Sequence, residues 1–137
     1  MALNTQCASN NIGRSTAPPP VAVLMLIYKI ISKELWQDAE TTGLFKGAPV
    51  DIADGFIHFS TATQVQETAR RHFKGQSDLL LLTLDDQDLG NALIYEPSRG
   101  GDLFPHLYAP LSTKHVMRIA SLPILADGTH DFEGLLP

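Results

Sequence analysis

DLLLLTLD, residues 78–85, is the stretch that decides the fold, because its apolar run is short and lies between two aspartates. An apolar run of about four to eight residues between turn signals is typical of a strand that is buried on both faces. Both edges of such a strand must also be hydrogen-bonded, so it needs a neighbour on each side. We therefore predict that residues 78–85 form the central strand of a sheet.

Two strand–helix units are predicted before this segment in the chain. Residues 27–31 are mostly β-branched or aromatic, which favours a core strand. Ser32 then offers an N-cap, and Gly43 a C-terminal stop, for a first helix. Residues 46–54 contain glycine and proline and end in an Asp-Gly pair, so we expect a loop that turns into a strand at Phe56–Ser60.

A second helix follows that strand, and further strands complete the chain. Thr61 and Gln64 match a capping box, and apolar residues recur at helical spacing until Gly75. Strands are then predicted at residues 92–96, 104–111 and 115–123. This order of elements predicts an α+β domain with two early helices packed on a mixed or antiparallel sheet.

Length and composition fit one folded domain. The chain has 137 residues, of which 44% are hydrophobic and 18% charged, so it has enough apolar surface for one core. Residues 1–20 are rich in Ser, Thr, Asn and Pro, which predicts a flexible leader. That leader is either a targeting segment or a misassigned start. We expect the domain itself at residues 21–125 and a turn-rich C-terminal tail at residues 126–137.

Charge and cysteine content exclude several classes of function. The net charge of −5 argues against non-specific nucleic-acid binding, which needs a basic surface. The apolar run at residues 21–31 is shorter than the roughly 20 residues of a membrane span, so no membrane association is expected. Cys7 is the only cysteine, which excludes a disulfide framework within the chain and favours a reducing, cytoplasmic location. The sequence indicates no oligomeric state.

The first candidate site lies at the end of the strand predicted at 56–60. Strand side chains alternate between faces, so Phe56, His58 and Ser60 are expected on one side. The following helix begins directly after them, and its free N–H groups suit a phosphate or carboxylate. In the alternative interpretation His58 is a hydrogen-bonded core histidine and Ser60 only caps the helix.

A second cluster of polar side chains surrounds the Gly100-Gly101 pair. It consists of Glu96, Arg99, Asp102, His106 and Tyr108. Glu96 is the candidate acid/base or hydroxyl-binding group and Arg99 the candidate anion clamp, while His106 and Tyr108 are expected to line the same pocket. The alternative is a surface ion pair between Glu96 and Arg99 with little energetic weight.

Other kinds of site find little support. His58, His106 and His115 lack the spacing of known zinc motifs, so no metal site is predicted. Ser60 lies outside a nucleophile-elbow motif, and the chain has neither a glycine-rich phosphate loop nor a dinucleotide-binding fingerprint. These observations argue against a serine hydrolase and a Rossmann dehydrogenase.

Three segments resemble the domain of unknown function 952 family: IYKIISKELW (27–36), DGFIHFSTATQV (54–65) and EPSRGGDLFPHLYAPL (96–111). The resemblance covers about residues 26–123. It implies a small, mostly bacterial domain without an established reaction, whose fold is similar to that of ADP-ribosyltransferases. In related NAD-using enzymes, a first-strand His or Arg, a second-strand polar motif and a later catalytic residue surround the nicotinamide.

The resemblance also implies roles for particular residues. Glu96, His58 and His106 match the catalytic positions, and the residues implied in cofactor binding are Tyr28, Lys29, Ser60, Thr61, Arg99 and Tyr108. Lys29 departs from the family pattern, because a lysine is a point charge and reproduces neither an imidazole nor a bidentate guanidinium.

Two hypotheses therefore remain open at the level of sequence. In the first, the domain binds NAD or a related nucleotide as a small-molecule ligand and transfers ADP-ribose. In the second, it is a non-catalytic module that binds a small molecule or a protein in the same cleft.

Overall fold

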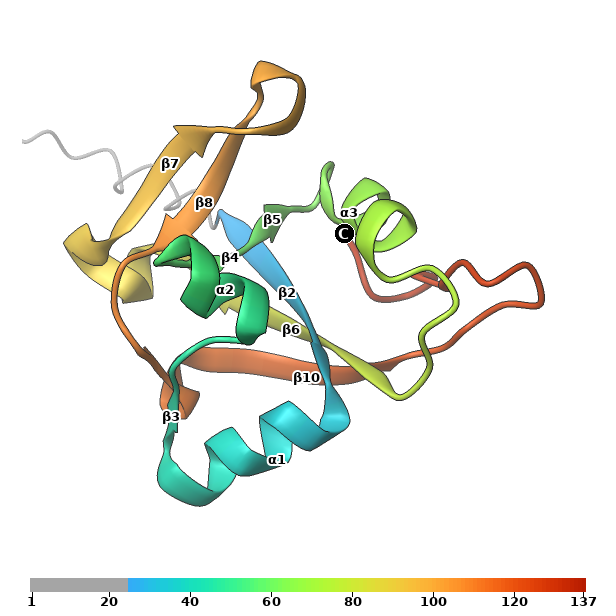
Figure 1. Ribbon diagram of the computed structural model, residues 1–137, viewed down its shortest axis with the longest axis horizontal. Helices are drawn as coiled ribbons and strands as arrows, with labels where there is room; N and C mark the ends of the chain where they lie inside the picture. The colour runs from blue at the N-terminus through green and yellow to red at the C-terminus, as the bar shows by residue number, and fades with distance from the viewer. Residues whose placement is uncertain (1–24) are drawn as a thin grey trace, which may run out of the picture.

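The computed structural model describes residues 25–137, except for the side chain of Arg99. The leader predicted at residues 1–20 lies outside this range. The described chain is an α+β domain in which every strand pair is antiparallel (Figure 1). None of its helices is long and apolar enough to cross a membrane.

The central strand is where the sequence predicts it. β6 (Leu79–Asp85) pairs with β10 (Val116–Leu122) on one edge and with β2 (Leu26–Ser32) on the other. β5 (Ser60–Thr61) pairs with β2 and completes a four-stranded sheet in the order β10-β6-β2-β5. Six of the seven residues of β6 are buried, because apolar clusters cover both faces of this sheet.

The first helix also agrees with its sequence signals. α1 (Lys33–Thr42) begins at Ser32, whose hydroxyl accepts a hydrogen bond from the Leu35 N–H at 3.2 Å. It ends at Gly43, which adopts the left-handed conformation at φ 83° and donates to the Ala39 carbonyl at 2.7 Å. Such a backbone conformation costs little for glycine, which explains the residue at this position.

The prediction of a loop at residues 46–54 is wrong, because this segment contains a short helix. α2 (Pro49–Asp54) has proline at its first position, where the missing N–H costs nothing. The Asp51 carboxylate accepts from the Ala48 N–H at 2.8 Å, and Gly55 closes the helix at φ 89°. The glycine and proline that favoured a loop are here the two terminal signals of a helix.

The strand predicted at Phe56–Ser60 is split into two strands of different sheets. β4 (Ile57–His58) joins a three-stranded sheet in the order β4-β8-β7, with β8 at Leu103–Leu107 and β7 at Leu93–Pro97. Phe59 connects β4 to β5, and its N–H donates to the Pro105 carbonyl at 3.0 Å. The chain thus changes sheets at Phe59, which no alternation pattern in the sequence could indicate.

The remaining elements are short. β3 (Leu44–Phe45) and β9 (Leu111–Ser112) form a two-stranded sheet, and α3 (Val65–His72) follows β5. Three 3₁₀ helices occupy Asp86–Ala92, Arg99–Gly101 and Thr113–His115. The expectation of two early helices on one sheet is therefore corrected to three α-helices and three sheets within residues 25–137.

Two apolar clusters hold these layers together. One includes Trp36 of α1, Phe45 and Leu107, on the side of the four-stranded sheet that carries Ile27. The other lies on the opposite side and packs α3 and the C-terminal segment against Tyr28 and Leu81. Figure 1 shows the C-terminus next to α3. The turn-rich residues 126–137 therefore contribute to the core through a buried side chain, that of Phe132.

Candidate functional site

The three-stranded sheet gathers the chemically active side chains on one face. Opposed residues of antiparallel strands share a face, and His106 of β8 lies opposite both His58 of β4 and Ile94 of β7. The other face carries Ile57 and Leu107, which are buried in the core. On the His58–His106 face, Ile94 and Glu96 of β7 are partly exposed, whereas His106 is buried. We call this surface the histidine face and define it by His58, His106, Ile94, Glu96, Phe56 and Tyr108.

A buried ion pair between Lys29 and Asp51 contacts His58 from the core side. Its Nδ1 lies 2.6 Å from the Asp51 carboxylate, which also accepts from the His58 backbone N–H at 3.2 Å. Lys29 lies 3.2 Å from Asp51 and donates from Nζ to the His58 carbonyl at 3.0 Å. On the solvent side, His58 Nε2 lies 2.9 Å from the Asp54 carboxylate. Two carboxylates of α2 thus bracket one imidazole of β4.

His106 has a carboxylate of its own. Its Nδ1 lies 2.8 Å from Oε1 of Glu96, and the Tyr108 hydroxyl donates to the same oxygen at 2.7 Å. The His106 side chain is buried, whereas that of Glu96 is 34% exposed. Glu96 is therefore fixed by two donors and is still reachable by a ligand.

Phe56 joins the two histidines into one cluster. Its ring stacks on His106 with centroids 4.0 Å apart and lies 4.6 Å from His58 and 5.3 Å from Tyr108. The imidazoles themselves are 5.5 Å apart in an edge-on arrangement. Residues separated by 48 positions in the chain therefore form one contiguous patch.

The electrostatics follow from burial and hydrogen bonding. Burial by itself would raise the pKa of Asp51, but the His58 hydrogen bond, the Lys29 charge and two backbone N–H groups outweigh it and lower the pKa to about 2. Burial lowers the pKa of Lys29, and Asp51 counteracts part of this effect. The hydrogen bonds from Tyr108 and then His106 lower the pKa of Glu96, so this carboxylate is ionised at neutral pH.

The structure places the other predicted binding residues away from this face. Adjacent strand residues point to opposite sides, so Tyr28 lies in the cluster under α3 while Lys29 faces Asp51. Ser60 shares a hydrogen bond of 2.9 Å with Thr68 of α3, and the Thr61 N–H donates to the Gln64 side chain at 3.0 Å. The Arg99 side chain lies outside the described part of the chain.

Sequence reasoning missed Asp51 and Asp54, and it placed Phe56 on the side of His58 without giving it a role. The available signal was the start of α2, since proline at the first helical position and an acidic residue two positions later are typical of a helix N-terminus. That signal would have placed Asp51 and Asp54 on a helix directly before His58. Nothing in the sequence gives the distance between this helix and the β8 strand.

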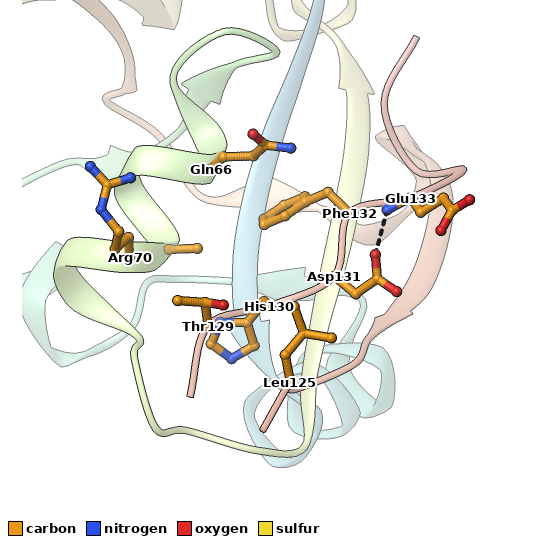
Figure 2. A pocket seen from close by; sticks show the side chains of 9 residues that line it. Gln66, Arg70, Leu125, Thr129, His130, Asp131, Phe132 and Glu133 are labelled. Carbon is orange, nitrogen blue, oxygen red and sulfur yellow. Dashed lines mark hydrogen bonds between the residues drawn. The ribbon is translucent and has the colours of Figure 1, made fainter. Parts of the chain in front are cut away.

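Two cavities of the described structure lie elsewhere. One of about 360 Å³ lies between α3 and the C-terminal segment, where Figure 2 shows Gln66 and Arg70 coming from the helix. The other, of about 400 Å³, lies between α1 and β3. Neither is lined by a residue of the histidine face. Among the described residues, no three potential metal ligands converge.

Fold and site together define a small α+β domain with two histidines on one partly exposed sheet face, each bound to a carboxylate through Nδ1. The chain belongs to the family described as "Protein of unknown function (DUF952)", whose model matches residues 30–119.

Solved structures of a related bacterial protein support this assignment. The chain is similar to protein CC0527 from Caulobacter crescentus, with 49% identity over 79% of this chain and 95% of that chain and a TM-score of 0.77 to its crystal structure. The solution NMR structure of CC0527 covers 81% of this chain and 96% of its own, with 49% identity and a TM-score of 0.73. None of the curated proteins matches the chain.

Proposed function

We propose that the histidine face binds NAD or a related nucleotide and supports transfer of ADP-ribose, in a domain whose fold is akin to that of ADP-ribosyltransferases. The observation that carries this proposal is the fixation of Glu96 by His106 and Tyr108, at 2.8 and 2.7 Å, on an exposed aromatic surface. A rigid carboxylate next to flat rings is the arrangement that cleavage of a nicotinamide–ribose bond requires.

The proposed reaction requires Glu96 to be ionised and held in a fixed position. As the bond between nicotinamide and ribose breaks, positive charge develops on the ribose, and a carboxylate held in advance stabilises this charge without reorganising. The lowered pKa of Glu96 keeps it in the charged form that this role needs. His106 and Tyr108 hold the Glu96 side chain in one orientation, so its carboxylate stays in a fixed position.

The surroundings of Glu96 suit a nucleotide. Tyr108 and Ile94 are 46% and 45% exposed and flank the buried His106 ring, so a planar base or nicotinamide ring finds apolar contact there. The carboxylates of Glu96 and Asp54 add negative charge to the same surface. A cationic ring, such as oxidised nicotinamide, is therefore preferred over a neutral one of the same shape.

Lys29 takes a different part from the one that the resemblance implies. Its ammonium group is buried and directed at Asp51 and the His58 carbonyl, so it supports the site from inside. Ligand contacts are therefore assigned to His58, Glu96 and Tyr108. A cytoplasmic location agrees with this proposal, because NAD is an intracellular cofactor and the chain has a single cysteine.

The test uses the full chain with NAD as the probe. Calorimetry measures binding of NAD and of NADH, and chromatography measures nicotinamide release. We expect NAD to bind more tightly than NADH and nicotinamide to be released. Glu96→Gln should still bind NAD, with a smaller preference over NADH, but release nicotinamide about 10²- to 10³-fold more slowly, because its charge acts mainly in the transition state.

Glu40→Gln is the matched control, since Glu40 is an exposed carboxylate on α1, and it should behave as wild type. Binding without nicotinamide release would favour the non-catalytic binding module. If the wild-type chain neither binds NAD nor releases nicotinamide, the proposed function is refuted.

A further inference from the structure

Asp51 is the most extensively bonded side chain next to the histidine face, and the proposed role of Glu96 does not use it. The residue is 2% exposed. Its Oδ2 accepts from the Ala48 N–H at 2.8 Å and lies 3.2 Å from Lys29 Nζ, while its Oδ1 accepts from the His58 backbone and ring. Burying two opposite charges is costly, and a pair of apolar residues would often stabilise the fold as well. The pair therefore calls for a second explanation.

The contacts of the pair converge on one residue, His58. Asp51 binds its backbone N–H and its Nδ1, and Lys29 binds its carbonyl oxygen at 3.0 Å. Three atoms of a single residue are thereby fixed from the core side. Because a carboxylate only accepts hydrogen bonds, Nδ1 must carry the proton. The other ring nitrogen, Nε2, is then directed away from the core.

Asp54 covers that outward nitrogen in the ligand-free molecule. Its Oδ2 lies 2.9 Å from His58 Nε2, its side chain is 49% exposed, and it is the last residue of α2 before Gly55. A half-exposed side chain at a helix end moves at little cost when a ligand arrives. The His58 ring is itself 33% exposed, so a ligand that displaces Asp54 gains direct access to Nε2.

We propose that His58 Nε2 takes the proton of the acceptor in the reaction proposed above, that this acceptor is a hydroxyl group or water, and that Asp51 is the positioning residue that presents Nε2 outward. The proposal rests on the proposed function. The acceptor oxygen forms a bond to the ribose C1′, and the bond from C1′ to the nicotinamide nitrogen breaks. The electron pair neutralises the pyridinium, and the acceptor proton passes to Nε2.

The groups around His58 fit this division of roles. Lys29 of β2 and Asp51 of α2 lie on the core side of His58, and Asp54 lies next to Nε2. The His106 ring of β8 lies edge-on to the His58 ring, 5.5 Å away, and Glu96 binds Nδ1 of His106. While Asp54 accepts from Nε2, that nitrogen holds a proton and cannot take another. When a ligand displaces Asp54, Nε2 loses its acceptor and releases its proton to solvent, so the neutral imidazole can take the proton of the acceptor, and Glu96 of β7 stabilises the ribose.

The positioning role is tested on the ligand-free wild-type chain by ¹⁵N NMR of the imidazole nitrogens. In the neutral form of the His58 ring, we expect Nδ1 to carry the proton and Nε2 to be unprotonated. Asp51→Asn should abolish this preference for one nitrogen. Glu96→Gln is the matched control, because it removes the corresponding carboxylate of His106 and should leave the His58 signals in place. A His58 ring protonated on Nε2 alone in wild type would overturn the positioning role.

The catalytic role is tested through nicotinamide release with water as acceptor. Asp51→Asn should lower kcat by about 10²- to 10⁴-fold with KM for NAD nearly unchanged, the range of a lost general base. Asp38→Asn, which changes an exposed carboxylate on α1 outside the site, is the matched control and should leave kcat unchanged. If Asp51→Asn fails to fold, His58→Gln replaces it in this assay, with the same expected loss.

The outcomes separate this inference from the function on which it rests. Active wild type with an undiminished kcat in Asp51→Asn or His58→Gln overturns the inference and leaves the proposed function standing. Wild type without activity overturns the proton-transfer role together with the proposed function, and the NMR result alone then decides whether Asp51 positions His58.

Discussion

The stability of the domain should depend strongly on the ion pair between Lys29 and Asp51. Three variants form a double-mutant cycle: Asp51→Asn, Lys29→Met and the double variant. Both side chains are buried, with 7% and 1% exposed, so solvent screens their interaction little. Asp51→Asn leaves the Lys29 ammonium without its charge partner in the core, and Lys29→Met does the same to the carboxylate.

The pKa of Asp51 gives the combined magnitude of its interactions, namely the His58 hydrogen bond, the Lys29 charge and two backbone N–H groups, against the cost of burial. It falls from 3.8 to about 2 on folding, and at about 1.36 kcal/mol for each tenfold change this corresponds to about 2 kcal/mol. Because the folded-state pKa is the lower one, the unfolded chain binds more protons between these values. The contribution is complete above about pH 5, is reduced by about 1 kcal/mol at pH 3, and is lost as pH falls through about 2.

Asp51→Asn also leaves the buried Lys29 ammonium without its charge partner, which adds to this loss of stability. Removal of one partner of a buried pair typically costs about 3–5 kcal/mol, so we expect Asp51→Asn to lower the free energy of unfolding at pH 7 by this amount. The double variant should lose less than the two single variants together, with a coupling of about 2 kcal/mol or more. The difference between wild type and Asp51→Asn should shrink as pH falls from 5 to 3.

Urea denaturation monitored by the fluorescence of Trp36, which is buried in α1, measures these free energies. Ser121→Ala, a change of an exposed side chain on β10, serves as a control with a negligible effect. Additive effects of the two single substitutions, or a loss below about 1 kcal/mol in Asp51→Asn, would refute the reasoning.

Two further substitutions test the packing of the domain. Ser32→Ala removes the hydroxyl that caps α1 and should lower the free energy of unfolding by about 1 kcal/mol, measured in the same urea titration. Phe132→Ala should lower the free energy of unfolding by about 3–5 kcal/mol and raise the rate of hydrogen exchange in α3, because Phe132 is buried in the apolar cluster under that helix. An unchanged unfolding midpoint would show that the C-terminal segment does not stabilise the domain.

Local signals were sufficient where an element depends on its own residues. The aspartate-bounded leucine run predicted β6, and Ser32 with Gly43 predicted both ends of α1. The same signals failed at residues 49–54, where proline and glycine occur both in loops and at helix ends. They also failed at Phe59, because a change of sheet depends on which distant strand offers a free edge.

The sequence by itself determined the fold class, the central strand, and the polar residues His58, Glu96, His106 and Tyr108 as a candidate site. Composition, short apolar runs and capping residues are local properties, and they are present in the chain before it folds. Only the tertiary structure decided that α2 packs on the Lys29 side of β2 and α3 on the Tyr28 side, and that Asp51 reaches His58. These relations depend on the register between β4 and β8 and on the position at which α2 packs. Both are set by contacts between segments far apart in the chain.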